Sequence, residues 1–194
     1  MTTSRVYKAE GIILKRKNYG EADRILTVFT KEYGKVRAIA KGIRKVSSRR
    51  APHLEIFMRV AVVLHMGKSL ESISEVTPIK VYEDIRTDLA RVSIAYYLCE
   101  LVDNLLPERQ EHRDVFTLLT DALEDVRTIP VSHIYKVSKT FTLELLWALG
   151  YLPRGKALTG IKLQDFIEAI TERRIKSTHF ARLLIDQVPS SGVK

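Results

Sequence analysis

The sequence predicts an α+β protein in which a small β-barrel, residues 1–80, precedes an all-α helical domain, residues 81–194. Two observations carry this prediction. Up to Pro78, apolar and polar residues alternate in short runs between turn residues, as in half-buried strands. Beyond Pro78, apolar residues recur every three or four positions, as on one face of a helix. The chain therefore divides into two regions of different secondary structure.

Five short runs rich in Ile, Val, Leu and Phe make up the first region. Tyr33-Gly34 is the expected turn of a hairpin, and Gly67-Lys68 is the expected tight turn between the last two runs. Short strands without a helical period between them indicate a small closed barrel, so we expect an N-terminal five-stranded OB-fold β-barrel. The runs are 7–17, 24–30, 31–42, 55–66 and 70–79.

Amphipathic stripes in the second region predict a bundle of about five helices. Pro107, Pro130 and Pro153 follow the first three stripes, and proline does not continue a helix. We expect Ser177 or Thr178 to cap the last helix. The expected helices run from Ile85 to Leu106, Val115 to Val126, Ile134 to Leu149, 163 to 174 and 178 to 188.

The composition excludes several classes of protein. The longest apolar run, 60–64, is far shorter than the roughly 20 residues that a membrane helix needs. The N-terminal residues lack the apolar segment of a secretory signal. Cys99 is the only cysteine, which excludes an internal disulfide and a cysteine-based zinc cage. These observations predict a cytoplasmic protein without a membrane partner.

Positive charge is concentrated in the barrel region. The whole chain has a formal net charge of +9. Residues 1–80 alone have a net charge of +10, whereas residues 81–194 have a net charge of −1. A generally basic protein would spread its charge evenly along the chain. The asymmetry therefore indicates a polyanion-binding module joined to an electrically ordinary one.

No catalytic or cofactor-binding motif stands out. The sequence Gly67-Lys68-Ser69 is similar to the end of a P-loop, but Val62 stands where that loop needs glycine, and both flanks are predicted strands. The five histidines are scattered, with no pair at i, i+4 spacing and no cysteine nearby. The sequence therefore favours a protein that is not an enzyme and has no metal site and no cofactor.

Basic residues of the barrel region predict a binding surface for single-stranded nucleic acid, because such a surface needs Lys and Arg along the phosphates. Arg24 also has another interpretation, since its neighbour Asp23 offers a structural ion pair. The predicted cations are Lys41, Arg44, Lys45, Arg49 and Arg50 of the stretch AKGIRKVSSRR, together with Lys35, Arg37 and Arg24 on the adjoining strands.

Aromatic side chains supply the flat faces on which bases stack, at about 1–3 kcal/mol per base. Tyr19 is expected in a polar loop beside Gly20, where stacking on a base and packing on the barrel rim are both open. Tyr33 and Phe57 are further candidates. We expect Phe57, like Phe29, to pack in the core or at the rim of the barrel instead.

Residues 10–45 read EGIILKRKNYGEADRILTVFTKEYGKVRAIAKGIRK, in which the elements YGEADRIL, T-x-E-Y-G and A-K-G-x-R follow in order. This segment resembles the N-terminal segment of the RecO family of bacterial DNA repair and recombination mediators. The later stretch ELLWALGYLP, 144–153, resembles the end of the family's long helix, and IKSTHFARLLI, 175–185, resembles its C-terminal helix. The resemblance therefore extends over the front, middle and end of the chain.

One segment departs from the family pattern. Typical RecO proteins carry a four-cysteine zinc module directly after the segment that matches GYLP, whereas RGKALTG, 154–160, follows here without any cysteine. We therefore do not expect the family's zinc site in this chain, and we expect a shorter connection between helices in its place.

The resemblance implies an OB-fold on a helical domain, binding of single- and double-stranded DNA, and annealing of complementary strands at the bacterial nucleoid. It also implies partners: RecR, the acidic C-terminal tail of single-stranded DNA-binding protein, and indirectly RecA, the recombinase that is loaded onto DNA. In this mechanism the cations neutralise phosphates and release counterions, and no catalytic group is needed.

Two other functions stay open at this point. One is a non-catalytic protein-interaction adaptor whose basic barrel binds acidic peptides; retardation of an oligonucleotide by the protein alone distinguishes it from a DNA-binding protein. The other is a nuclease, which needs clustered carboxylates to hold metal ions. The seven acidic residues of the barrel region are spread over many elements, which disfavours a nuclease.

Overall fold

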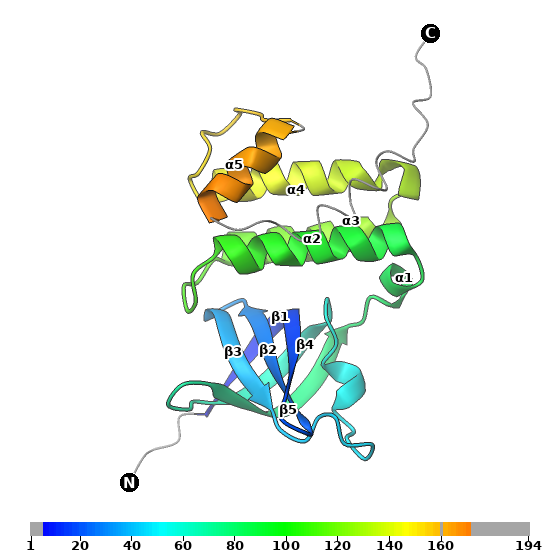
Figure 1. Cartoon of the computed structure of the whole chain (residues 1–194), viewed down its shortest axis with the longest axis vertical. Helices are drawn as coiled ribbons and strands as arrows, with labels where there is room; N and C mark the ends of the chain where they lie inside the picture. The colour runs from blue at the N-terminus through cyan, green and yellow to red at the C-terminus, as the bar shows by residue number, and fades with distance from the viewer. Residues whose placement is uncertain (1–5, 160, 172–194) are drawn as a thin grey trace. The chain divides into compact units, whose positions relative to one another are not determined.

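The computed structural model describes residues 6–159 and 161–171. Its first part is a closed barrel of five strands in the order β1-β2-β3-β5-β4 (Figure 1). Because β5 lies between β3 and β4, the barrel has the non-sequential strand order of an OB-fold. The predicted α+β class, a five-stranded barrel followed by helices, is confirmed. The strands are β1 (Val6–Tyr19), β2 (Asp23–Thr30), β3 (Gly34–Ala40), β4 (Arg59–His65) and β5 (Glu71–Lys80).

The long strand β1 joins the two sides of the barrel. Its first half pairs with β4 and its second half with β2, both antiparallel. The register with β2 shifts between Ile13 and Lys15, an irregularity that bends a strand and increases its twist. The barrel closes on the opposite side, where β3 and β5 pair in parallel at Ala38 with Glu71 and Ile39 with Ser72.

Alternate residues of the strands fill the barrel, as the sequence pattern predicts. Phe57 and Phe29 are buried, which agrees with packing in the protein rather than with exposed stacking faces. The ring centroid of Phe29 lies 5.8 Å from that of Phe116, and neither Phe29 nor Phe57 belongs to the cluster that fills the barrel. The buried residues inside the barrel include Leu26 and Val28 of β2 and Val36, Ala38 and Ala40 of β3.

The fourth strand begins later than predicted. β4 starts at Arg59, whereas the apolar run 55–66 indicated strand from its first residue. Phe57 has a φ of 75°, which lies in the left-handed region and is incompatible with an extended strand. Its N–H donates to the Ile13 carbonyl at 2.9 Å, and the Ile13 N–H donates to the Met58 carbonyl at 3.1 Å. The irregular segment is therefore fixed to β1.

The second part of the chain is helical, and the helix predicted from Ile85 to Leu106 consists of two helices. Asp88 lies between them, and its side chain accepts a hydrogen bond from the Arg91 N–H at 2.9 Å. This is an N-cap, which starts a new helix rather than continuing the previous one. The helices are α1 (Glu83–Arg86), α2 (Leu89–Leu105), α3 (Arg113–Thr128), α4 (Ile134–Ala148) and α5 (Ile161–Thr171).

The apolar stripe expected along this helix is wrong in part; it comprises Ile85, Leu89, Val92, Tyr96, Cys99, Val102 and Leu106. Leu89 is 70% exposed and Tyr96 is also exposed, whereas Cys99 and Val102 are buried as expected. The helix α2 is apolar on more than one side, so a single stripe of 3.6-residue period does not describe it. Its further buried residues are Ile94, Ala95, Leu98, Leu101 and Leu105.

The other helix predictions agree with the structure where it describes them. The stripe Val115 to Val126 lies in α3, and the stripe Ile134 to Leu149 lies in α4 up to Ala148. α5 begins two residues before the predicted 163–174 and is helical to the last described residue, Thr171. The helix predicted at 178–188, with its cap at Ser177 or Thr178, lies outside the described residues. No helix of the described ranges is both long and apolar enough to cross a membrane.

Two compact units make up the chain. One contains residues up to Tyr82 together with Val102–Phe116, and the other contains Glu83–Leu101 and the residues from Thr117 onward. The predicted domain division at residues 80 and 81 stays a prediction, because the end of α2 and the start of α3 group with the barrel. In the second unit, the Arg91 guanidinium donates to the Arg127 carbonyl at 2.9 Å and so joins α2 to α3.

A buried carboxylate joins β5, β1 and the segment 102–116. Glu71 is 0% exposed, and it accepts hydrogen bonds from the Tyr7 hydroxyl and the Arg109 guanidinium. A buried charge is tolerated only when it is paired in this way. Burial and the hydrogen bond to Glu71 raise the pKa of Tyr7 above its ordinary value, so the hydroxyl keeps its proton and remains a donor.

The turn between β2 and β3 packs closely against Gln110 of the segment 102–116, and two glycine substitutions test this contact. Gly34 has a φ of 66°, and a Cβ at Gly34 would lie 2.0 Å from the Gln110 carbonyl oxygen. Gly20 has a φ of 57° with nothing within 4 Å of such a Cβ. We expect Gly20→Ala to lower the free energy of unfolding by about 1–2 kcal/mol, the cost of left-handed backbone. Gly34→Ala should lower it by about 1–3 kcal/mol more, because of the clash. Urea denaturation measures both, and equal losses would contradict the tight packing at Gln110.

Candidate nucleic-acid interface

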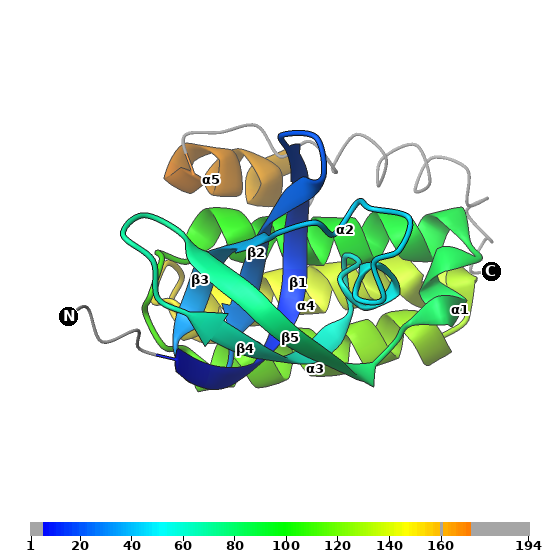
Figure 2. The same ribbon diagram turned by 90° about the horizontal axis from the view of Figure 1, so that it is seen from below.

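Residues 41–50, here called the basic loop, leave the end of β3 beside the β1–β2 hairpin (Figure 2). Two main-chain groups of the loop bind this hairpin. The Gly42 N–H donates to the Asp23 carboxylate at 2.7 Å, and the Arg44 N–H donates to the Ala22 carbonyl at 2.8 Å. The first half of the basic loop is therefore held in place by the hairpin.

Arg50 holds the second half of the loop. Its guanidinium donates to the carbonyls of Ile73 and Ser74 on β5, at 2.7 and 3.3 Å, and to the Lys41 carbonyl at 2.7 Å. The side chain is half-buried. The Arg50 guanidinium thus donates to three main-chain carbonyls. Because Lys41 begins the basic loop and Arg50 ends it, these hydrogen bonds connect both ends of the loop to β5.

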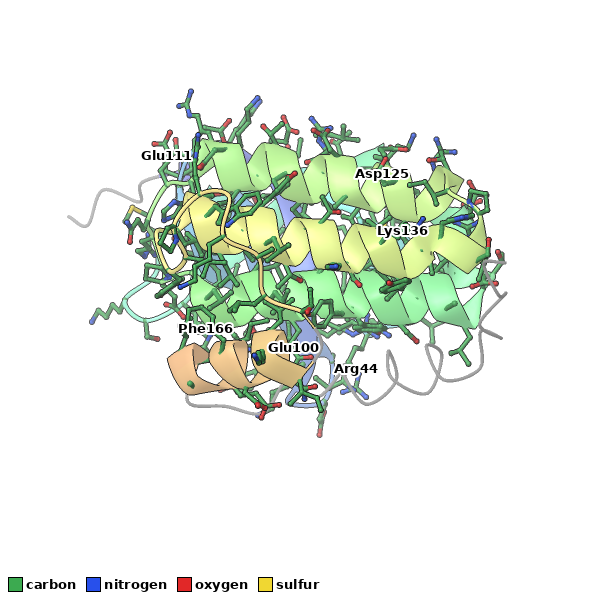
Figure 3. The ribbon with its side chains drawn as sticks, turned by 90° about the horizontal axis from the view of Figure 1, so that it is seen from above. Arg44, Glu100, Glu111, Asp125, Lys136 and Phe166 are labelled. Atoms are coloured by element: carbon green, nitrogen blue, oxygen red, sulfur yellow. The ribbon has the colours of Figure 1, made fainter. Side chains whose placement is uncertain are left out.

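The remaining cations of the basic loop are exposed. In the part of the chain that the structure describes, no carboxylate forms a salt bridge with any of them. Arg44 lies beside the β1–β2 hairpin (Figure 3), and its guanidinium donates to the Gly20 carbonyl at 3.2 Å. The loop therefore presents uncompensated positive charge from four side chains, Lys41, Arg44, Lys45 and Arg49.

Positive charge continues along the outer face of the barrel. Arg37 of β3 pairs with Thr27 of β2, which in turn pairs with Lys15 of β1, and residues that pair across antiparallel strands share a face. Arg37, Lys15 and Lys17 are exposed, and Lys15 also lies 3.5 Å from the Asp103 carboxylate. The alternation of β1 marks Lys15 and Lys17 as outward-facing, but the sequence does not give the register that aligns β1 with Arg37.

Lys35 has a different environment from the other predicted cations. It is 7% exposed, its Nζ lies 3.3 Å from the Asp103 carboxylate, and it also donates to the Asp103 carbonyl. A buried ammonium group requires such partners. Lys35 therefore connects β3 to the segment 102–116, and little of its surface is open to a ligand.

Arg24 forms a structural ion pair, although not with the neighbour that the sequence suggested. Its guanidinium lies 3.1 Å from the Glu55 carboxylate, while Asp23 accepts the Gly42 N–H instead. Arg16 of β1 donates to the same Glu55 carboxylate. This pairing links the hairpin to the segment before β4, and it was not predictable because Glu55 is distant in sequence.

The candidate stacking residues lie at opposite ends of β2. Tyr19 is the last residue of β1 rather than part of a loop, is 53% exposed, and precedes the glycine that Arg44 contacts. Tyr33 lies in the β2–β3 turn, with its ring centroid 4.5 Å from that of Tyr7. Phe57 is buried. Among these three, the exposed ring next to the basic loop is that of Tyr19.

Two sequence-family profiles match the chain. The profile described as Recombination protein O N terminal matches residues 1–82, and the profile described as Recombination protein O C terminal matches residues 86–157. Together they cover most of the chain, including the barrel and α2 to α4. The chain belongs to the RecO family.

Curated RecO relatives from several bacteria agree with this assignment, and each is named DNA repair protein RecO. The relative from Roseiflexus sp. (strain RS-1) is 39% identical over 150 residues, 77% of this chain and 52% of the relative. That from Desulfitobacterium hafniense is 37% identical over 149 residues, and that from Symbiobacterium thermophilum 36% over 155 residues. The matches cover 54% and 61% of these two relatives, so the chain spans little more than half of their length.

The zinc module of typical RecO proteins has no counterpart after the segment GYLP. Residues 154–160 contain no cysteine, so they do not fit a four-cysteine zinc site. Throughout residues 6–159 and 161–171, no group of three or more His, Cys, Asp or Glu is placed to hold a metal ion. In this connection the Trp147 indole N–H donates to the Lys156 carbonyl at 3.0 Å, which fixes the chain between α4 and α5.

Substitution of two neighbouring arginines tests whether Arg50 has a structural role that the exposed Arg49 lacks. We expect Arg50→Ala to lower the free energy of unfolding by about 1.5–3 kcal/mol, because hydrogen bonds made by a charged group are lost. Arg49→Ala removes an exposed cation from the same loop and should change it by less than about 0.5 kcal/mol. Urea denaturation measures both changes. Equal stabilities of the two variants would show that Arg50 does not hold the loop.

Proposed function

We propose that the chain binds single- and double-stranded DNA through the basic loop and the outer face of β1 to β3, and anneals complementary strands in recombinational repair. The observation that carries this proposal is the set of four exposed loop cations, Lys41, Arg44, Lys45 and Arg49, without salt bridges to described carboxylates. Membership of the RecO family supports a role in DNA repair and recombination.

Binding in this proposal is driven by counterion release. Each phosphate that a Lys or Arg neutralises releases part of the condensed ion atmosphere, so affinity falls linearly with the logarithm of salt concentration. Tethers at Gly42, Arg44 and Arg50 hold much of the loop in place before DNA arrives. A loop that is already ordered loses less conformational entropy on binding.

Annealing follows from the same electrostatics. Two complementary strands repel each other through their phosphates, and neutralisation on one surface lowers that repulsion. Stacking of a base on the exposed ring of Tyr19 would hold the strand with its bases accessible. This mechanism requires neither a catalytic group nor nucleotide hydrolysis. In this proposal the protein acts at the bacterial nucleoid.

The proposed partners are those implied by the family: RecR, the acidic C-terminal tail of single-stranded DNA-binding protein, and RecA indirectly. The groove between α3 and α4 is a poor candidate for the acidic tail. It is lined by the buried side chains of Val137 and Phe141. The exposed carboxylates of Asp121, Asp125 and Glu144 line it as well, together with Lys136. Figure 3 labels Asp125 and Lys136. An acidic peptide would meet like charge there.

The alternative function is a protein-interaction adaptor whose basic barrel binds acidic peptides, because the same cations attract either polyanion. The two functions differ in their preferred ligand. A fluorescent oligonucleotide and an acidic peptide of equal charge, titrated at moderate salt, discriminate between them. Tighter binding of the oligonucleotide by the protein alone supports DNA binding, whereas tighter binding of the peptide supports the adaptor.

Removing the exposed charges should weaken DNA binding. We expect the combined variant Lys41→Gln, Arg44→Gln, Lys45→Gln and Arg49→Gln to bind single-stranded DNA at least about tenfold more weakly, with a salt slope smaller by about 3, and to lose annealing. Fluorescence anisotropy over a salt series and an annealing assay with labelled complementary strands measure these effects.

The matched control removes the same charge elsewhere. The variant Lys136→Gln, Lys139→Gln, Arg154→Gln and Lys156→Gln changes four exposed cations outside the barrel. It should keep the wild-type salt slope, because no phosphate contact is lost. Equal slopes for the two quadruple variants would mean that the basic loop is not the binding site.

Tyr19 allows a separate test of base stacking. Tyr19→Ala should weaken binding of single-stranded DNA by about 1–3 kcal/mol, while Tyr19→Phe keeps the ring and should bind as the wild type does. Tyr33→Ala removes an aromatic ring at the other end of β2 and should leave the affinity unchanged. Anisotropy titrations measure all three variants, and equal affinities of Tyr19→Ala and Tyr33→Ala would contradict stacking on Tyr19.

A further inference from the structure

Two arginines of the β1–β2 hairpin bind a single carboxylate. Arg24 places a guanidinium nitrogen 3.1 Å from Oε1 of Glu55, and Arg16 donates to Oε2 of the same group. The cluster is partly open to solvent, since the side chains of Arg16 and Glu55 are 36% and 24% exposed. The carboxylate presents two acceptor oxygens to two guanidinium groups, which is also how a phosphate is recognised.

The register of the hairpin puts both arginines on one face. Arg24 pairs with Asn18, and Arg16 lies two residues before Asn18 on β1, so all three side chains share a side of the sheet. The Arg24 Nε also donates to the Asn18 Oδ1 at 3.3 Å. Arg24 is therefore held by a neutral partner as well as by Glu55, and its orientation does not depend on the carboxylate alone.

The main chain at Glu55 is fixed by its buried neighbours, whereas its carboxylate is held by side chains. Leu54 and Phe57 on either side are buried, and the Phe57 N–H donates to the Ile13 carbonyl at 2.9 Å. The carboxylate of Glu55 is held by the two arginines and is partly solvated. Rotation of one side chain is therefore enough to vacate the space between the arginines, without any movement of the loop.

We propose that Arg16 and Arg24 form a phosphate site for the DNA backbone, in which Glu55 is a resident anion that a phosphodiester replaces. The inference rests on the proposed DNA binding. The site adjoins the exposed cations of the basic loop, because Arg44 donates to the Gly20 carbonyl of the same hairpin. A strand bound at the loop brings further phosphates to this hairpin at high local concentration.

The exchange is feasible because a phosphodiester offers the arginines charge-assisted hydrogen bonds in place of those that the carboxylate gives up. A phosphodiester has the same charge as the carboxylate, so the arginines remain neutralised to the same extent after the exchange. Glu55, once released, turns to water. In this arrangement Glu55 keeps two cations away from weak anions and lowers the affinity of the hairpin for DNA until a polyanion competes.

The decisive comparison is between two variants with the same change of charge. Glu55→Gln removes the resident anion, whereas Glu21→Gln removes an exposed carboxylate of the same hairpin for which the described structure shows no salt bridge. We expect Glu55→Gln to bind single-stranded DNA about 3- to 10-fold more tightly than Glu21→Gln does. Its salt slope should be steeper by about 0.7, the contribution of the one phosphate that the two arginines neutralise on a single strand.

A variant without the two arginines tests whether the gain in DNA affinity depends on them. In a chain with Arg16→Gln and Arg24→Gln, the substitutions Glu55→Gln and Glu21→Gln should have equal effects on affinity. The same double arginine variant with Glu55 intact should bind DNA about 3- to 10-fold more weakly than the wild type. This last measurement does not require Glu55→Gln to fold, and circular dichroism with urea denaturation checks the fold of each variant.

The outcomes separate this inference from the proposed function. If the wild type binds DNA but Glu55→Gln gains no more than Glu21→Gln, the resident-anion site is refuted while DNA binding stands. Weaker binding by Glu55→Gln refutes it as well, because Glu55 would then position the arginines for DNA. Failure of the wild type to bind any oligonucleotide refutes both. A gain that disappears in the Arg16→Gln, Arg24→Gln background supports the exchange.

Discussion

Glu71 begins β5 at the position where that strand pairs in parallel with β3, and its carboxylate is fully buried. The Tyr7 hydroxyl of β1 and the Arg109 guanidinium satisfy it, so one group connects three parts of the first unit. Losing one partner of a buried charge costs about 3–5 kcal/mol, because the charge left behind is uncompensated. Closure of the barrel and attachment of the segment 102–116 therefore depend on the same interaction. The β1–β2 hairpin and the basic loop take no part in it.

The cations of the barrel unit divide into two groups with different physical roles. Lys35, Arg24 and Arg50 are satisfied by carboxylates or main-chain carbonyls, and they join elements that are far apart in the sequence. The other group is exposed to solvent and includes Arg37, Lys41, Arg44, Lys45 and Arg49. The positive field of the unit is the sum of both groups, but only the exposed side chains can meet a phosphate without first giving up a partner in the protein.

The basic loop combines order at its ends with exposure between them. Asp23 and the Ala22 carbonyl hold its beginning, and Arg50 holds its end on β5. The turn at Lys45 to Ser48 between them has a hydrogen bond of 2.9 Å and is otherwise open to solvent. Such a loop keeps its cations close together, so under the proposed DNA binding it loses less conformational entropy than a free segment of this length would.

The sequence by itself determined the strands, the hairpin turn at Gly34, the change of period after Pro78 and the charge asymmetry, because these features depend on residues close together in the chain. It also carried the motifs of the RecO family. The tertiary structure alone decided which cations are exposed. Arg24 and Glu55 are 31 residues apart, and Arg50 and Ile73 are 23 apart. Their pairing follows from strand register and barrel closure, which a local pattern does not contain. The stretch 41–50 therefore predicted five equivalent cations, whereas the fold uses Arg50 to hold the loop and leaves four exposed to solvent.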